Sequence, residues 1–368
     1  RVSAELFPRP SKLPSPNECQ SDVIPTMDEL GLSSRKLTNR PIPGEVAALA
    51  TLNSFLDERG RNYRKGMSSP ITGEIMCSRI SPYLSAGCLT IKQVFHHTVS
   101  RQRQIKLDPR SAENRGFTSS LTSFQSRLAW HCHFMQKFES EPELEHRNMA
   151  RSCDGLREND FAEAKFQAWC TGHTGYPFID ACMRFLIAEG WINFRMRAML
   201  MSFAAYDLWL HWQRPAHHLA QLFIDFEPGI HYPQVQMQSG TTGINTLRIY
   251  NPIKQSMDQD PEGEFIRRWV PECAGFDQLR IHAPWEATAM EQLAAGCQIG
   301  EHYPEPIVDH MSAARFAKAQ FAGVRRTAAG QADKQSVMQR HGSRKPSSRQ
   351  TSSRNRGAQK KPAASIKK

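Results

Sequence analysis

The chain has 368 residues, of which 39% are hydrophobic and 23% are charged, with a formal net charge of +11. This length allows one large domain with appended segments. The nine cysteines include no Cys-x-x-Cys pair, which excludes a disulfide framework and any sequence-local metal site; only a cluster assembled from distant positions stays open. The longest apolar run, 198–212, is too short to span a bilayer, so we expect a cytoplasmic protein without a membrane segment.

The positive charge is concentrated at the C-terminus. Thirteen Lys and Arg residues and one acid, Asp333, lie in 324–368, whereas the rest of the chain has 34 basic and 35 acidic residues. Because this tail has almost no large apolar residues, we expect 323–368 to be disordered. Two interpretations are open: a solvated tail without a specific partner, or, as we favour, non-specific attraction to nucleic-acid phosphate.

The first part of the chain predicts an arm followed by helices. Residues 1–43 are rich in Pro and Ser and are expected to form a linker or an extended arm on a domain surface. Apolar residues at helical spacing predict a helix over 45–63 and another over 121–138. Between them, Ser81-Pro82 starts a helical pattern that should break near Gly87.

The central part predicts more helices. Residues 177–190 have Pro177 in the first turn, Gly190 as the stop and an Asp180–Arg184 pair four residues apart. The following segment is apolar nearly all round and predicts a buried helix that carries Trp209 and Trp212 one turn apart. Since strand signals are almost absent, the predicted fold class is all-α, with one domain over 44–322.

The segment 223–252 follows another short predicted helix and shows neither a helical nor a strand period. Ordering such a segment costs conformational entropy, so it is expected to have a function. It contains Asp225 and Glu227, which are the nearest carboxylates for Arg195 and Arg197 in the dry segment before it. Two interpretations are open: an architectural Arg–carboxylate pair, or charges that flank a polar heterocyclic ligand.

Two further groups are weaker signals. Cys77, Ser78 and Ser81 lie where a loop meets a helix start, which suits either an anion site for phosphate or a simple helix cap. His131 and His133 lie on one predicted helix and are either satisfied core residues or residues that flank a pocket.

Several long stretches resemble the FAD-binding domain of the DNA photolyase/cryptochrome family. They include "TGYPFIDACMR", "RIYNP", "DPEGEFIRRWVPE", "CSRISPYLSAGCLT" and "FQSRLAWHCHF", in the order the family shows. The resemblance covers about residues 40 to 275 and implies the helical FAD domain of that family. The family's α/β antenna domain is absent from this sequence. The chain is therefore either a fragment or, as we favour from "WHCHF" and "HYPQVQMQSGTTGIN", a member of the short photolyase-like branch.

The resemblance implies FAD bound in a U shape, with two groups of contacts. Around the phosphates it places Tyr63, Cys77, Ser78, Ile80 and Ser81, and His131 stands where the family more often has Arg. Around the isoalloxazine it matches Arg197 and Asp225 to a buried pair, Glu227 to a carboxylate that contacts ribose or ring, and His231 to the residue that faces flavin N5.

The sequence also departs from the family pattern. Arg127 stands where dimer-repairing photolyases carry a substrate-contacting Glu, and Phe194, Ala198 and Met237 replace a substrate-side Asn, Met and Trp. Trp130 keeps its place at the lesion pocket.

The family's chain of three tryptophans is also incomplete, because only Trp212 is matched. Val235 and Asn159 stand at the other two positions. Photoreduction would therefore need another route, through Trp209, Trp191 or Tyr232.

The resemblance implies a light-dependent DNA repair flavoenzyme, a deoxyribodipyrimidine photolyase-like lyase. Excited reduced FAD would donate an electron to a pyrimidine dimer flipped out of the DNA. Arg127 would meet a backbone phosphate or a thymine carbonyl. Because the chain outside the basic tail is near neutral, we expect a monomer that binds duplex weakly and prefers single-stranded DNA. The alternatives are a cryptochrome-like blue-light photoreceptor without repair activity, which the altered pocket residues favour, and a protein that only stores flavin.

Overall fold

The structure, a computed structural model, describes residues 5, 6, 8, 10–12, 20–32, 35–112, 114–159 and 161–341. The predicted all-α class is confirmed, because the described residues form helices and the only β feature among them is an isolated bridge between Ile299 and Tyr303. Within the same residues, no helix is both long enough and apolar enough to cross a membrane.

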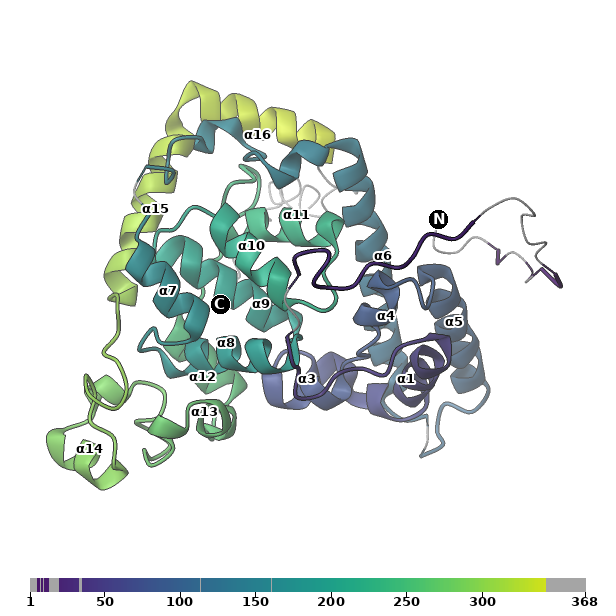
Figure 1. The fold of residues 1–368 in the computed structure, drawn as a ribbon, viewed down its shortest axis with the longest axis horizontal. Helices are drawn as coiled ribbons and strands as arrows, with labels where there is room; N and C mark the ends of the chain where they lie inside the picture. The colour runs from purple at the N-terminus through teal and green to yellow at the C-terminus, as the bar shows by residue number, and fades with distance from the viewer. Residues whose placement is uncertain are drawn as a thin grey trace, which may run out of the picture.

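The first group of helices forms one end of the molecule (Figure 1). It consists of α1 (Glu45–Asp57), α2 (Tyr63–Gly66), α3 (Pro70–Met76), α4 (Ser81–Ser85), α5 (Ile91–Leu107) and α6 (Phe117–Ser140). The expected break near Gly87 is present, because this glycine has a φ of 73° and separates α4 from α5. Phe55, Tyr63 and Phe124 pack their rings together and fix α1 and α2 against α6.

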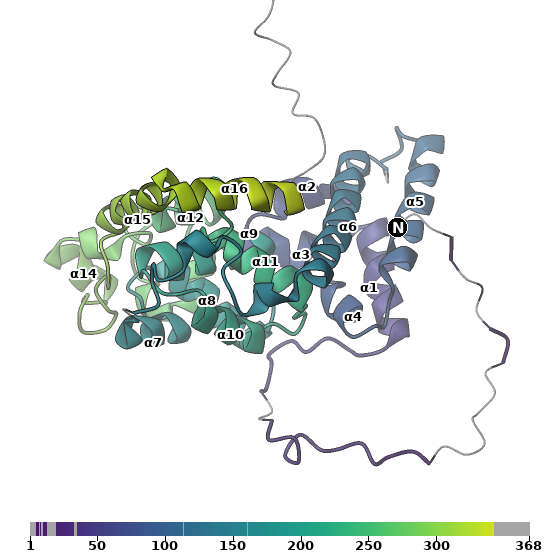
Figure 2. The ribbon, with the colours of Figure 1, turned by 90° about the horizontal axis from the view of Figure 1, so that it is seen from above.

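The second group forms the larger body around a core of large aromatic side chains that includes the fully buried Trp169 and Trp212. It consists of α7 (Glu163–Thr171), α8 (Pro177–Glu189), α9 (Phe194–Ser202), α10 (Gln213–Leu222), α11 (Pro228–Ser239), α12 (Pro252–Gln259), α13 (Glu264–Trp269), α14 (Ala289–Ala295), α15 (His310–Arg326) and α16 (Ala328–His341). Helix α11 packs against α6 and joins the two groups (Figures 1 and 2). The approach is close, since a Cβ on Gly229 would lie 2.7 Å from the Met135 sulfur.

Short helical segments complete the chain: 3₁₀ turns at Arg59–Asn62, Pro142–Glu145, Arg151–Cys153, Pro271–Cys273 and Pro284–Glu286, and a π-helical turn at Phe203–Asp207. The π-helical turn follows α9 and corrects the prediction for the central helix. The helix ends at Asp207, and Trp209 has a left-handed φ of 55°. Trp209 and Trp212 therefore do not lie on one helix, because no period of 3.6 residues connects them.

The segment 223–252 is also more regular than predicted, because α11 occupies its centre. Pro228 stands in the first turn and Gly240, with a φ of 82°, ends the helix. The helix is buried on most sides and holds Pro233 in its interior. A helix buried all round has no amphipathic period, which is why its sequence shows no pattern.

The tail is helical as far as the structure describes it, which corrects the expectation of disorder from residue 323. Helix α15 continues to Arg326, and α16 follows with Val337 fully buried. Glu141 bonds to Arg340 and to His341, and this ties α16 to the end of α6. Val337 packs against Leu144 and Met149 of the body, whereas Met338 is exposed. Residues 342–368 lie outside the described residues.

The arm predicted over 1–43 contacts the body through its last residues. The Arg35 guanidinium donates to the Leu222 carbonyl (2.6 Å), and Thr38 N–H donates to the Ala188 carbonyl (2.9 Å). The Asn39 amide bonds to both carboxylate oxygens of Glu189 at 2.9 and 3.0 Å. These residues lie across the ends of α8 and α10.

The predicted Asp180–Arg184 pair is wrong, because each side chain finds a better partner. Asp180 is fully buried and accepts hydrogen bonds from the Thr174 and Gly175 backbone and from the Tyr303 hydroxyl. Arg184 instead bonds to Glu272 at 2.9 Å. The carboxylate at this helix start thus organises the preceding loop rather than a helical ion pair.

Replacing Asp180 by Ala should lower the free energy of unfolding by about 2–4 kcal/mol, because buried donors are left without an acceptor. Urea denaturation at pH 7 measures this change. The matched control is Asp258→Ala, which removes an exposed carboxylate paired with Lys254 and should change stability by less than about 0.5 kcal/mol. Equal effects of the two substitutions would contradict this account of Asp180.

Candidate functional site

Arg197 and Asp225 form a bidentate ion pair at the centre of the site. Arg197 Nη1 and Nη2 donate to the two Asp225 oxygens at 2.9 and 2.8 Å, and Arg197 Nε donates to the Ile192 carbonyl at 2.7 Å. The guanidinium carbon lies 4.1 Å from the Phe223 ring centroid. The predicted pairing is confirmed. Its two parallel hydrogen bonds fix the plane of the guanidinium group.

Arg195, which shared this prediction, has no carboxylate partner among the described residues. Its Nη1 lies 3.5 Å from the Gln255 amide oxygen, and its Nε is buried without a hydrogen bond. Glu227 stands immediately before α11 and is half-buried, which raises the pKa of its carboxyl group. No hydrogen bond joins the Glu227 carboxylate to another described residue, so it stays available to a ligand hydroxyl.

His231 lies on α11 and is neutral at physiological pH. Burial lowers its pKa to about 4, and the nearby Arg197 charge acts in the same direction. His231 Nε2 lies 2.9 Å from the Ala216 carbonyl oxygen. Because a carbonyl only accepts, Nε2 must carry the proton, and Nδ1 is left as an acceptor.

Arg59 fixes the loop 77–80 through hydrogen bonds. This guanidinium donates to four backbone carbonyls, at Thr51, Ile75, Cys77 and Ser78, over distances of 2.6 to 3.1 Å. Ile80 is buried, while Ser78 and Ser81 are partly exposed. Burial raises the pKa of the Cys77 thiol to about 11, so it is not a thiolate.

Arg79 occupies a strained position in the same loop. Its φ is 61°, and its guanidinium carbon lies 3.9 Å from the Trp191 ring centroid. Arg79 Nη1 is buried without a hydrogen-bond partner among the described residues. A left-handed backbone conformation and a buried donor without an acceptor both cost free energy. An anionic ligand that accepts a hydrogen bond from Arg79 Nη1 would offset this cost, so the atom indicates an anion-binding site.

Helix α6 supplies Arg127, Trp130 and His131, which lie on one face because they are three and four residues apart. Arg127 is exposed, and its charge acts on the hydroxyl of the buried Tyr63 on α2. Trp130 is 48% exposed and stacks on Phe134, with centroids 5.7 Å apart. His131 is half-buried, and its Nδ1 has no partner although it is buried.

Most of the predicted residues converge. The Arg197 charge acts on both the Cys77 thiol and His231, and the Asp225 charge acts on Arg79 and His231. The Arg127 charge acts on Tyr63. Residues from α2, the 77–81 loop, α6, α9 and the α10–α11 connection therefore meet at the junction of the two helical groups.

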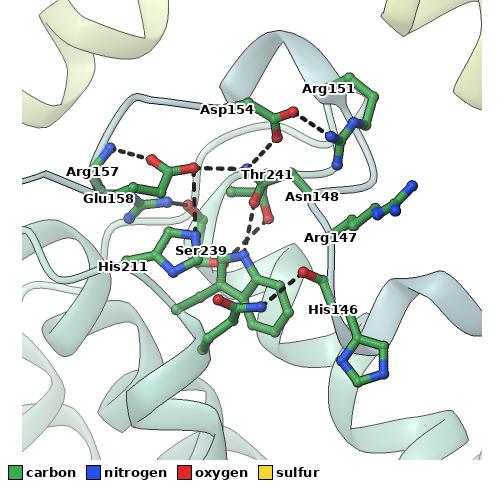
Figure 3. A network of polar contacts seen from close by, with 12 residues as sticks. His146, Arg147, Asn148, Arg151, Asp154, Arg157, Glu158, His211, Ser239 and Thr241 are labelled. Carbon is green, nitrogen blue, oxygen red and sulfur yellow. Dashed lines mark hydrogen bonds and ion pairs between the residues drawn. The ribbon is translucent and has the colours of Figure 1, made fainter.

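Trp212 lies outside this set, in a buried polar network (Figure 3). Its indole N–H donates to the Asn148 amide oxygen at 2.7 Å, and the Asn148 amide nitrogen donates to Asp154 at 2.9 Å. Ring contacts lead from Trp212 toward the site through Tyr232, whose ring centroid is 6.5 Å from Trp212 and 5.2 Å from His231.

Arg157 closes the same network from the far side. It is completely buried, and its guanidinium donates to the Ala205 and Ser239 carbonyls, both at 2.7 Å. Glu158 lies 3.7 Å from His211 and accepts from the Arg157 backbone N–H (Figure 3). The network therefore fixes the loop 146–158 against the end of α11.

The site as a whole has the chemistry of a pocket for a dinucleotide. Arg79 Nη1 and His131 Nδ1 are buried polar atoms without partners, and Ser78 and Ser81 are partly exposed hydroxyl residues at a loop. On the other side, the rigid Arg197–Asp225 pair and the His231 acceptor suit a planar heterocycle. The residues present therefore fit FAD, with an anion at one end and a polar ring system at the other.

Comparison with known proteins gives the same class. The family model for the FAD-binding domain of DNA photolyase matches residues 124–323. The deoxyribodipyrimidine photo-lyase of Alkalihalophilus pseudofirmus is 31% identical over 285 residues, which are 76% of this chain and 56% of that protein. The cryptochrome DASH of Gloeobacter violaceus is 28% identical over 82% of this chain and 60% of that protein.

A solved structure agrees with the fold. The bacterial class III photolyase from Agrobacterium tumefaciens aligns with a TM-score of 0.69 and 30% identity, over 77% of this chain and 57% of that one. The chain thus belongs to the photolyase/cryptochrome family, and FAD is the cofactor of its family domain. It spans just over half the length of these curated relatives.

Two residues of the site were missed from sequence alone. Arg79 lies inside the segment that carried the resemblance, yet only its neighbours were singled out. An arginine in a loop just before a Ser-Pro helix start is a sequence pattern that could have predicted an anion-binding site. Arg59 had no signal, because its role depends on four carbonyls that come together only in three dimensions.

The buried neutral His231 predicts a pH dependence of stability. An unfolded histidine takes up a proton near pH 6.5, whereas folded His231 does so only near pH 4. Stability should therefore fall as pH drops through this window, by about 3 kcal/mol from this residue. In His231→Gln and His231→Asn, urea denaturation at pH 7 and pH 4 should show a correspondingly smaller difference. A difference as large as in the wild type would contradict the assignment.

Proposed function

We propose that this chain is the FAD-bearing, lesion-binding part of a light-dependent repair enzyme for pyrimidine dimers in DNA. The observation that carries the proposal is the exposed Trp130, set beside Arg127 and one residue before the half-buried His131. A half-exposed tryptophan on a helix at the edge of a cofactor site is suited to stack on a base taken out of the helix. The relatives named as photolyases support the substrate class.

The residues around the cofactor then have separate tasks. Arg79, Ser78, Ser81, Tyr63 and His131 would hold the diphosphate end, and Cys77 and Ile80 would line it. Arg197 and Asp225 would orient the ring system, Glu227 would bind ribose or ring, and the His231 acceptor would face a ring N–H. Bound reduced FAD supplies light-driven electron donation to the dimer.

On the substrate side, Trp130 would stack on the dimer, and Arg127 would donate to a phosphate or a thymine carbonyl. Trp212 is buried and fixed by Asn148, so we assign it to the supply of electrons to the cofactor rather than to the lesion.

The direct test uses protein reconstituted with FAD, reduced chemically and illuminated with oligonucleotides that contain one thymine dimer, single- or double-stranded. We expect thymine to be restored, most readily in single strands. Light-driven flavin reduction without restored thymine on either form of DNA would contradict the repair function and favour the photoreceptor. The exposed Phe194, which replaces a polar substrate-side residue, is the observation that supports this second function, a photoreceptor without repair activity.

Trp130→Ala should weaken binding of dimer-containing DNA by about 1–3 kcal/mol, because one base loses its stacking partner. Trp130→Phe should restore most of the affinity, and both variants should retain FAD. Fluorescence anisotropy in the dark measures the affinity, and absorbance measures the flavin content. Equal affinity of Trp130→Ala and the wild type would remove this residue from the lesion site.

A further inference from the structure

Charge is distributed very unevenly over the body of the protein. Residues 59–127 contain 12 Lys and Arg and three acidic residues, whereas 257–309 contain three Lys and Arg and 11 acidic residues. The two regions lie at opposite ends, as α5 and α14 show in both views (Figures 1 and 2). The near-neutral average of the body therefore hides a positive end, and it is a poor guide to DNA affinity.

Six basic residues at the positive end are exposed and make no ion pair within the described part of the chain. We call them the basic patch: Arg64, Lys65, Arg103, Lys106, Arg110 and Arg115. Two neighbouring basic residues have partners and are not part of the patch. Arg59 donates to backbone carbonyls, and Arg101 donates to the Leu56 carbonyl and pairs with Asp57. A surface that keeps six like charges unpaired is repulsive unless an anionic partner covers it.

Specific contacts place the patch residues of α2 beside those of the α5–α6 connection, and Arg103 and Lys106 lie in the last turns of α5, which leads into this connection. Arg61, next to α2, donates to the Ala112 carbonyl at 3.0 Å in the α5–α6 connection. The Ser120 hydroxyl at the start of α6 donates to the Arg61 carbonyl at 2.9 Å. The segment that carries Arg64 and Lys65 therefore lies beside the connection that carries Arg110 and Arg115.

Helix α6 runs from the basic patch to Trp130. Thirteen residues separate Phe117 from Trp130, which is about 20 Å at 1.5 Å per residue. No acidic residue occurs between Phe117 and Phe138, and the exposed Ser119, Thr122 and Ser126 lie along the way. A polyanion can follow this helix without meeting a negative side chain.

We propose that the basic patch binds the phosphates of a duplex DNA segment about six base pairs from the base held at Trp130. At 3.4 Å per step, about 20 Å corresponds to six steps of one strand. The proposal rests on the proposed function, and it assigns a phosphate surface to the body of the protein rather than to the tail.

The first test compares two triple variants of the FAD-loaded full chain. The patch variant carries Lys65→Gln, Lys106→Gln and Arg110→Gln. The control variant carries Lys36→Gln, Arg315→Gln and Lys318→Gln, which removes the same number and kinds of exposed charge from the arm and α15, outside the basic tail. The affinity for a dimer-containing duplex is measured in the dark from 0.05 to 0.3 M salt.

We expect the patch variant to bind at least about tenfold more weakly at 0.1 M salt, and the slope of log K against log salt to fall by about two to three. The control variant should keep the wild-type slope. Circular dichroism and flavin absorbance should be unchanged in both. An unchanged slope in the patch variant, or an equal loss in the control variant, would overturn the proposal.

The second test uses the length of the DNA. With 12 base pairs on each side of the dimer, the patch variant should bind more weakly than the wild type, whereas with three base pairs on each side the two should bind equally. A deficit that persists on the short duplex would place the contact elsewhere and overturn the proposal. Dimer splitting is measured separately, so failure of repair with a retained patch effect would defeat the proposed function and leave the phosphate surface standing.

Discussion

The bidentate pair of Arg197 and Asp225 is the constraint on which the site depends. Asp225 is almost completely buried, and a buried carboxylate is stable only if a cation and well-directed donors satisfy it. The pair joins α9 to the α10–α11 connection and holds the guanidinium against the Phe223 ring. Burial keeps the neighbouring His231 neutral. A rigid, partly exposed guanidinium beside a neutral acceptor is suited to a planar heterocycle with both donors and acceptors.

Much of this site could be predicted from the sequence, because the free-energy cost of an unpaired buried charge can be recognised at a single residue. Arg197 in an apolar segment had to find a carboxylate, and the irregular segment that follows offered Asp225. Helices with clear punctuation, such as Pro177 to Gly190, were predictable for the same reason. Asp180 shows where this reasoning fails: spacing of four residues indicated Arg184, but burial favoured the Thr174 loop, and the Tyr303 hydroxyl that completes it is 123 residues away. Helix α11 and helix α16 were missed because one is buried nearly all round and the other has few apolar residues.

The two helical groups contribute different residues to the site. The smaller group contributes the loop of Arg79, the exposed face of α6 and the positive end, whereas the larger body contributes the ion pair and His231. The candidate cofactor site therefore lies where the two groups meet over one continuous hydrophobic core, and the smaller group contributes the buried Arg79 Nη1 and His131 Nδ1, which have no partner among the described residues. The exposed Trp130 and the buried Trp212 also lie on different elements, so in the proposed function the binding of substrate and the supply of electrons would involve different parts of the fold.

The most direct measurement is the flavin content of purified protein when the central pair is changed without loss of volume. Asp225→Asn keeps the shape but removes the charge, and Arg197→Gln with Asp225→Asn keeps a neutral hydrogen-bonded pair that can preserve the fold. With circular dichroism as the control for folding, our account predicts that the wild type carries about one FAD per chain and that the folded double variant neither retains nor rebinds FAD. A folded double variant that binds FAD as tightly as the wild type, or a wild type that refuses added FAD, would contradict it.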